Sequence, residues 1–302
     1  TWVFNALSSC VIVEDTENLT DTCVITLPKK VTWEGNSAGT PIKRGDAITV
    51  KLGYTPPGMA PDACDLKIRF SGYVRTVDTR APVKLECEDG MFLLKLETTQ
   101  QRGFKNIMLS ELIRILLAGT KFKFKLIGDD VNLGPYRITR PTVADELNEL
   151  KRERNLMAYF CLDDNDESVL FVGYHYPMES KHRESFVHSN NIIAEELTYR
   201  RSEDIKIKVK ATSVNRKNVR SKIELPQNIG KDCQEISAFI YNADYDTLKL
   251  FAEATLRKYR YTGHQGSFET FGEPAMHKCD IAHIEPSDGK MGDYVIKKLE
   301  VS

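Results

Sequence analysis

Short runs of alternating apolar and polar residues recur along this chain, and they constrain its fold more than any other feature. Ala47–Leu52 is one such run, and three more occupy residues 66–70, 73–77 and 83–87. Alternation places successive side chains on opposite faces of a strand. Ser71 and Gly72 are predicted to break the second run from the third. Several short strands without a long helix indicate a small barrel or sandwich at the start of the chain.

The character of the sequence changes after Lys95. Residues 107–118 have helical spacing of apolar side chains, with Asn106 as the expected cap. A second helix is predicted to begin at Thr142, because Asp145 and Glu146 would lie in its first turn. Strands are expected at residues 121–126, 156–162 and 169–174. This part is predicted to be an α/β module.

Strand patterns return in the last third, around one further helix predicted at residues 245–259. The expected strands cover residues 193–199, 205–210, 221–225, 275–284 and 294–301. Arg44-Gly45-Asp46 and Lys278-Cys279-Asp280 each precede an apolar strand, and residues 72–74 faintly match residues 293–295. We therefore predict an α+β, mostly β fold in which two β-rich modules of similar design, residues 1–97 and 179–302, flank an α/β insert at 98–178.

One stretch near the end, residues 266–274, carries an aromatic side chain on each face of a predicted strand. Phe268 falls on one side and Phe271 on the other, and Gly272 and Pro274 end the strand. A free-standing sheet usually buries one face and exposes the other. We therefore expect Phe268, Phe271, Gly272 and Pro274 to lie at an interface with another module or subunit.

The composition excludes few partners. The net charge of −1 argues against a dedicated nucleic-acid binder, and the apolar stretch at residues 107–119 is too short and too interrupted to span a bilayer. The seven cysteines are odd in number and widely spaced. They are expected to be free, mostly buried thiols in a reducing compartment.

No catalytic, metal-binding or cofactor-binding residues are predicted. His277, Cys279 and His283 would share a face of one strand, but same-face neighbours lie about 7 Å apart, which is too far for one ion. Residues 163–167 lack the glycine and closing glutamate of a calcium loop and are expected to form an acidic turn. Cys87 lies beside two carboxylates, which disfavour its thiolate.

Basic residues concentrate between residues 200 and 222, against two acidic ones, Glu203 and Asp204. Lys206, Lys208 and Lys210 share one strand face, while Arg216 and Lys217 belong to the following hairpin tip. Such a group could contact phosphates if the charges converge. The alternative is a solvated strand face that discourages aggregation between sheet edges.

The order of these motifs resembles the baseplate hub proteins of contractile-tailed bacteriophages, the group of late control protein D and Mu-like tail proteins. The hub portion of type VI secretion spike proteins is a more distant relative. The resemblance covers most of the chain, and the residues that carry it are Arg44-Gly45-Asp46, residues 50–54, 70–74, 85–89 and 93–95, Gly263, and residues 266–274 and 292–297.

This resemblance implies a homotrimer in which each subunit contributes two tube-like β-barrel modules, so that three copies form a ring of six. The ring would adapt the sixfold tail tube to a threefold spike in the virion baseplate, after synthesis in the bacterial cytoplasm. It would leave a channel for DNA, which Lys206, Lys208, Lys210, Arg216 and Lys217 could line. Because the chain shows neither a repetitive β-helix nor a lysozyme-like segment, the spike is expected to be a separate protein, and no small-molecule substrate is expected.

Two other functions stay open at this point. The chain could be a tail-associated cell-wall hydrolase, because glycosidase carboxylates have no fixed spacing in sequence. It could also be a monomeric β-rich module that binds carbohydrate or protein.

Overall fold

The computed structural model describes residues 3–4, 7–28, 41–55, 64–163, 165–174, 182–215, 217–227 and 233–302. Strands predominate in this part of the chain, together with four helices. The predicted α+β, mostly β fold class is confirmed. Among the described residues, no helix combines the length and the apolar character that crossing a membrane requires.

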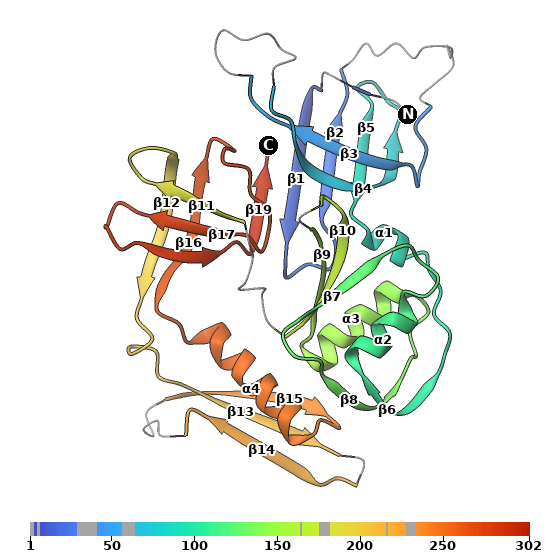
Figure 1. Ribbon diagram of the computed structural model, residues 1–302, viewed down its shortest axis with the longest axis vertical. Helices are drawn as coiled ribbons and strands as arrows, with labels where there is room; N and C mark the ends of the chain where they lie inside the picture. The colour runs from blue at the N-terminus through green and yellow to red at the C-terminus, as the bar shows by residue number, and fades with distance from the viewer. Residues whose placement is uncertain are drawn as a thin grey trace.

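The first sheet is antiparallel and has the strand order β19-β1-β2-β5-β4-β3. Its strands are β1 (Ser9–Asp15), β2 (Thr22–Thr26), β3 (Ala47–Leu52), β4 (Lys67–Asp78), β5 (Lys84–Glu88) and β19 (Lys298–Val301). The sheet curls, so that β3 and β4 cross in front of β1, β2 and β5 (Figure 1). Ile12, Ile25, Val50, Phe70 and Leu85 fill the space between these two layers.

Strand β4 is continuous, so the predicted break at Ser71 and Gly72 is wrong. Gly72 instead allows a close approach between strands. A Cβ atom at this position would lie 2.2 Å from the Glu88 carbonyl oxygen and 2.8 Å from the Phe70 ring. A glycine inside a strand can therefore mark a close backbone contact as well as a chain break.

The middle of the chain forms two small sheets with three helices. Strands β7 (Lys123–Ile127), β10 (Ser168–Gly173) and β9 (Met157–Leu162) make one sheet, and β6 (Gly103–Met108) pairs with β8 (Asn132–Arg137) in the other. The helices are α1 (Met91–Leu94), α2 (Leu109–Leu116) and α3 (Val143–Arg154). Helix α3 begins as predicted, because the Thr142 side chain accepts a hydrogen bond from the Asp145 backbone N–H.

The predicted cap of α2 is wrong. Asn106 lies within β6, and the position before the helix is Met108, whose side chain makes no capping bond. Asp130, from the loop before β8, accepts hydrogen bonds from the Ser110 backbone N–H at 3.0 Å and from its hydroxyl at 2.6 Å. The helix start is therefore satisfied by a residue distant in sequence, which local spacing does not reveal.

Two further sheets face each other near the end of the chain. One has the order β11-β17-β18, and the other pairs β12 with β16. Their strands are β11 (Arg183–Val187), β12 (Ile192–Arg200), β16 (Gly263–Thr270), β17 (Ile281–Glu285) and β18 (Gly292–Val295). Phe186, Ile192, Met276 and Ile284 are buried between them. Residues 275–280 are not a strand, and the predicted strand at 294–301 is divided between β18 and β19.

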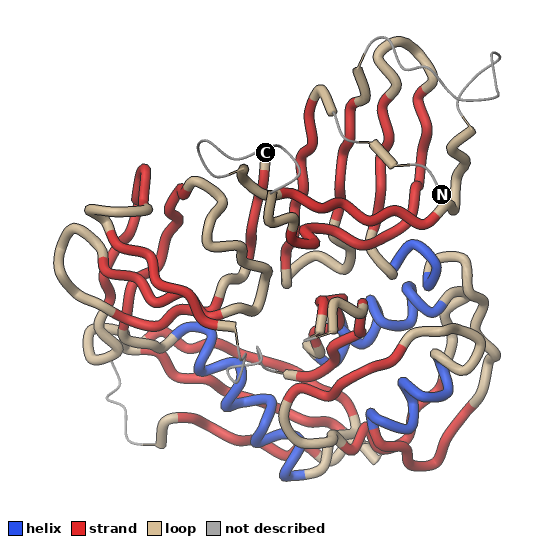
Figure 2. The backbone as a smooth tube through the Cα atoms, turned by 45° about the horizontal axis from the view of Figure 1, so that its top comes forward, coloured by secondary structure: helices blue, strands red, loops and turns tan. Residues whose placement is uncertain are grey.

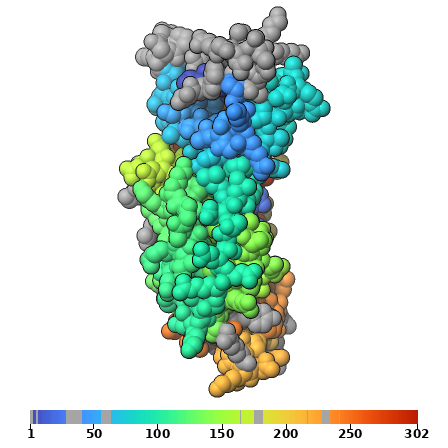
Figure 3. Space-filling model, turned by 90° about the vertical axis from the view of Figure 1, so that its right-hand side faces the viewer, coloured from blue at the N-terminus to red at the C-terminus, as the bar shows by residue number. Residues whose placement is uncertain are grey.

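The last sheet has the order β14-β13-β15 and is covered on one face by helix α4 (Figures 1 and 2). Its strands are β13 (Ile207–Val214), β14 (Arg220–Leu225) and β15 (Gln234–Tyr241), and α4 spans Tyr245–Tyr259, as predicted. Ala211, Ile223, Ile240 and Leu248 share one hydrophobic core with the α/β insert. The side view places the first sheet at one end of the molecule and this last sheet at the other (Figure 3).

The bounds of the three predicted domains stay a prediction.

The turns that precede β3 and β17 are built alike. In the first, the Asp46 carboxylate accepts the backbone N–H three residues upstream at 2.8 Å, and Gly45 has a φ of +91°. In the second, the Asp280 carboxylate accepts the N–H three residues upstream at 2.8 Å, and Cys279 has a φ of +74°. The weak sequence similarity between these two segments therefore corresponds to a repeated structure.

The strand that follows each turn is anchored by the same pair of backbone hydrogen bonds. Gly45 donates to the Val74 carbonyl at 2.8 Å, and Val74 donates back to Asp46 at 2.9 Å. Cys279 donates to the Ile296 carbonyl at 2.8 Å, and Ile296 donates back to Asp280 at 3.0 Å. The two repeats therefore align Val74 with Ile296, one residue away from the match of Tyr73 with Tyr294 that the sequence suggested.

Candidate functional site

The two phenylalanines of the 266–274 stretch have different environments. Phe268 lies on β16 and packs against Phe186, with ring centroids 5.1 Å apart, in the core between the last two facing sheets. Phe271 lies just beyond the strand end, and 59% of its surface is exposed. The stretch therefore has one core aromatic and one surface aromatic within this chain. A role for the exposed one in contacts with another subunit stays a prediction.

Residues 271–280, which we call the clasp, connect β16 to β17 and lie against the first sheet. The Tyr54 hydroxyl donates to the Phe271 carbonyl, and the Arg69 guanidinium donates to the carbonyls of Gly272 and Met276. The Glu273 carboxylate lies 3.8 Å from Arg69. Gly272, with a φ of +83°, permits the turn that presents these carbonyls. Gly272 thus contacts the first sheet. The predicted role of Gly272 and Pro274 at an interface between modules or subunits stays a prediction.

His277 extends the clasp onto β1 and β4. Its Nδ1 atom lies 2.8 Å from Glu14 Oε1, and its Nε2 atom lies 3.1 Å from the Ile68 carbonyl oxygen. Both ring nitrogens therefore face acceptors, which only the protonated imidazolium can satisfy with two donors. Burial lowers the pKa of His277, but the hydrogen bond and charge of Glu14 outweigh it and raise that pKa above its ordinary value.

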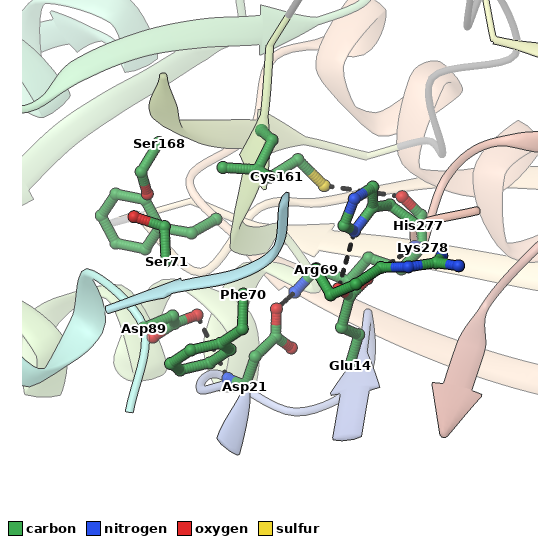
Figure 4. Close-up of a pocket in the computed structure, with 12 residues that line it drawn as sticks. Glu14, Asp21, Arg69, Phe70, Ser71, Asp89, Cys161, Ser168, His277 and Lys278 are labelled. Atoms are coloured by element: carbon green, nitrogen blue, oxygen red, sulfur yellow. Dashed lines mark hydrogen bonds and ion pairs between the residues drawn. The ribbon is translucent and has the colours of Figure 1, made fainter. Parts of the chain in front are cut away.

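A buried ion pair lies at the centre of this contact (Figure 4). Lys278 Nζ lies 2.5 Å from Asp21 Oδ2, and only 2% and 8% of the two side chains are exposed. The Lys278 backbone N–H donates to Glu14 at 2.8 Å. Its ammonium also lies 5.3 Å from the centre of the Tyr159 ring on β9. Lys278 thereby joins the first sheet, the α/β insert and the clasp.

Asp89 belongs to the same cluster of buried charged residues, which also contains Glu14, Asp21 and Lys278. Its carboxylate accepts the backbone N–H groups of Asp21 and Met91 at 3.1 and 3.0 Å. Burial raises the pKa values of Asp21 and Asp89 above their ordinary range, although Lys278 opposes both shifts. Burial would lower the pKa of Lys278, but the charge of Asp21 raises it above its ordinary value.

The three residues considered as metal ligands from the sequence do not converge in the structure. His277 binds Glu14, Cys279 packs on β9, and His283 lies 2.7 Å from Asp293, so the three candidate ligands point to different partners. No group of three or more metal-ligating side chains converges in the described ranges. Residues 275–280 form a turn rather than the predicted strand, so the predicted spacing along one strand does not apply to these three residues.

The remaining chemical candidates have structural roles. The Asp163 carboxylate accepts the N–H groups of Asn165 and Glu167 in the turn between β9 and β10, as predicted. Burial raises the pKa of the Cys87 thiol to about 12, which disfavours the thiolate. All seven cysteines are free, with three buried and four partly exposed, so fewer are fully buried than predicted.

The predicted basic face lies on the side of the β14-β13-β15 sheet that α4 leaves uncovered. Lys208 pairs with Glu224 on β14, and Lys210 lies 2.9 Å from Glu235 on β15. Lys206 and Lys217 are exposed, and Arg216 lies outside the described residues. Carboxylates on both neighbouring strands therefore offset part of the positive charge that the sequence showed on β13 alone.

Sequence reasoning singled out the 266–274 stretch and missed the charged cluster beside it. Glu14, Asp21 and Arg69 sit on ordinary strand or turn positions, and nothing in their spacing shows that they meet Lys278. In the sequence, Asp89 and the segment 278–280 stand out only as parts of motifs. The available signal was the repeated turn, because it predicts a defined conformation immediately before β17.

Comparison with known proteins shows where this architecture occurs. No model of a protein family and no curated protein matches the chain. A tail protein from Neisseria meningitidis MC58 aligns with a TM-score of 0.59 at 13% identity, over 96% of this chain and 86% of that one. The 43 kDa tail protein of prophage MuSo2 from Shewanella oneidensis aligns with a TM-score of 0.57 at 15% identity, over 96% and 88%.

The chain has the fold of these tail proteins. A type VI secretion component from Escherichia coli, itself structurally similar to the T4 bacteriophage tail proteins gp27 and gp5, aligns with a TM-score of 0.51 at 9% identity, over 96% of this chain and 68% of that one. The resemblance to tail and type VI secretion proteins is therefore confirmed at the level of the fold.

Proposed function

We propose that this chain is a structural component of a phage or prophage tail, or of a related injection device, and that it acts there as a baseplate hub. The fold shared with two tail proteins over 96% of the chain supports a tail role. The observation that carries the hub assignment is the repeated turn and strand pair at β3–β4 and β17–β18.

The repeat supports the hub assignment because it could match a threefold assembly to a sixfold one. A ring that joins a sixfold tube to a threefold spike needs two similar units in each of three subunits. The chain supplies two such units, one in the curled first sheet and one in the β11-β17-β18 sheet. The clasp fixes one unit against the other through Arg69, His277 and Lys278. Each chain can therefore present the two units in one fixed relative orientation.

In this proposal the exposed Phe271 belongs to the contact between subunits, close to Gly272 and Pro274. Lys206, Lys208, Lys210, Arg216 and Lys217 belong to the wall of a central channel through which DNA passes. The partners are two other copies of the chain, the tail tube protein and a separate spike protein. The protein acts by assembly and has no small-molecule substrate.

Stoichiometry tests this proposal. The chain is produced together with the tube and spike proteins of the same particle, and the purified complex is weighed by native mass spectrometry. The proposal predicts three copies of this chain for every three spike subunits and six tube subunits. A complex with one copy of this chain, or release of fragments from purified peptidoglycan by the isolated chain, would contradict it.

A further inference from the structure

Two thiols from distant parts of the chain meet beneath the clasp. Cys161 lies on β9 of the insert and packs against the small core that contains Cys279 of the clasp. Cys161 Sγ also lies 3.7 Å from the Lys278 carbonyl oxygen. A dashed line marks this contact in Figure 4. Cys279 is 5% exposed and packs in a small core with Tyr159 and Ile127. A bond between the two sulfurs would therefore join the insert to the clasp.

The backbone conformation at Cys279 indicates that its thiol has a functional role. Its φ of +74° lies in the left-handed region, where a Cβ atom is unfavourable and glycine is preferred. The equivalent position in the first repeat is occupied by Gly45, with a φ of +91°. Since one chain makes the same turn with glycine, the turn itself does not require cysteine. A side chain held in an unfavourable conformation points to a role for the group that it carries.

We propose that Cys161 and Cys279 form a redox-responsive dithiol, which hydrogen peroxide closes into a disulfide that locks the α/β insert to the clasp. The neighbouring Cys161 thiol lowers the pKa of Cys279 against the opposing effect of burial. Cys279 is therefore the thiol that ionises first, and reaction with peroxide follows thiolate character.

The reaction balances with one molecule of peroxide. The Cys279 thiolate attacks one peroxide oxygen, the O–O bond breaks, and a sulfenic acid and hydroxide form. The hydroxide takes the proton of Cys161 and becomes water. The Cys161 thiolate then attacks the Cys279 sulfur, the S–S bond forms, and the S–O bond breaks. The second hydroxide combines with the proton first lost by Cys279, so two thiols and one peroxide give one disulfide and two waters.

A second thiol pair provides an internal reference. Cys10 and Cys23 lie on the neighbouring strands β1 and β2, with their sulfurs 3.8 Å apart. Hydrogen bonds already hold these two strands together along the first sheet. A disulfide there would join elements of one sheet, whereas the Cys161–Cys279 bond would join two parts of the molecule. The two bonds can therefore be distinguished by their effects on stability.

A tail component leaves the reducing cytoplasm when its particle is released, and oxidation would then fix the clasp after assembly. This consequence rests on the proposed function. The disulfide itself does not, because it is a property of the isolated chain and can form whether or not the chain belongs to a tail.

The test uses the full-length chain treated with increasing hydrogen peroxide. Remaining thiols are blocked with iodoacetamide, the protein is digested without reductant, and cross-linked peptides are identified by mass spectrometry. We expect a peptide pair that contains Cys161 and Cys279, which dithiothreitol separates. Oxidation should raise the melting temperature by about 5 °C, because the bond closes a long loop.

Two variants serve as matched controls. Cys161→Ser should lose both the cross-linked peptide and the rise in melting temperature, whereas Cys10→Ser should keep both. Because the decisive measurement is made on the unaltered chain, poor folding of a variant cannot hide the result. Absence of the Cys161–Cys279 peptide from the oxidised wild-type protein, with or without a Cys10–Cys23 peptide, overturns the proposal. A cross-link that leaves the melting temperature unchanged overturns the locking role.

Discussion

Lys278 and Asp21 form a buried ion pair, with 2.5 Å between Nζ and Oδ2, that joins the clasp to the first sheet. The two residues are far apart in sequence, and Lys278 also lies against Tyr159 of the insert. Desolvation of two charges is unfavourable, so such a pair contributes less to stability than its distance suggests. Removing one of the two partners nevertheless leaves the other charge uncompensated in the interior.

Lys278→Met is therefore expected to lower the free energy of unfolding by about 3 to 5 kcal/mol. Lys67→Met is the matched control, since Lys67 pairs with Glu273 of the same clasp at 3.6 Å but is 45% exposed. This control should lower stability by about 0.5 kcal/mol. Urea unfolding measures both. The double variant Asp21→Asn with Lys278→Met should recover part of the loss, and a deficit equal to the sum of the two single changes would exclude the coupling.

The free energy of unfolding of the chain should fall as pH rises, because buried groups around the clasp titrate. Burial raises the folded pKa values of Asp21 and Asp89 above the ordinary value of 3.8, so the folded chain holds more protons than the unfolded one while these groups titrate. Their contribution is complete at acidic pH and is lost as pH rises through these folded values. The raised pKa values of His277 and Lys278 have the same sign. Their contributions are present below the ordinary pKa values and are lost as pH rises through the folded ones.

Urea unfolding between about pH 5 and pH 9 measures this dependence. Wild-type stability should decrease across the range, and Asp21→Asn should flatten the curve because one titrating group is removed. Asp204→Asn provides a control in an exposed turn. An equally steep decrease in Asp21→Asn and wild type would show that Asp21 does not contribute.

Phe268→Ala should lower the stability of the chain, whereas Phe271→Ala should mainly impair its assembly with other subunits. Phe268 packs against Phe186 in a core, so its removal should cost about 2 kcal/mol or more of stability. Phe271 is 59% exposed, so its removal should change the stability of the isolated chain by about 0.5 kcal/mol at most. Its effect should appear in assembly with other subunits, measured by native mass spectrometry. If Phe271→Ala assembles normally, the interface role of Phe271 is wrong.

Gly266→Ala should be strongly destabilising. A Cβ atom there would lie 1.8 Å from the Glu196 carbonyl oxygen on the paired strand, and the φ of +151° disfavours a side chain. We expect a loss of about 2 kcal/mol or more. Gly103→Ala is the control, since its Cβ would meet nothing within 4 Å. Thermal unfolding compares the two, and similar melting temperatures for both variants would contradict the packing described for β12 and β16.

Local sequence patterns predicted much of the fold, because the spacing of apolar residues reveals a helix or strand that buries one face. The α4 helix has the bounds predicted from its apolar stripe, and Thr142 caps α3 as its sequence indicates. The alternating pattern of residues 275–280 predicts a strand, but these residues form a turn. Their polar side chains instead bind Glu14 and Asp21 across the molecule.

Pairing between distant segments was not predictable from such patterns. Strand β19 joins β1 at the edge of the first sheet, and β15 lies parallel to β13 after a crossover. Neither relationship has a local signal, since the partner strands determine it. The same limit applies to the candidate site, where Arg69 and Lys278 meet only because the clasp folds back. The repeated turn was visible in sequence, but its register required the backbone hydrogen bonds to Val74 and Ile296.

Electron cryomicroscopy of the assembled particle tests the central claim most directly. Intact tails are purified from the producing bacterium, and the density at the tail tip is compared with this fold. Our account predicts three copies of the chain in one ring between tube and spike, with the β3–β4 and β17–β18 units alternating around it. A tail tip that lacks this chain, or that contains it outside the ring between tube and spike, would contradict the account.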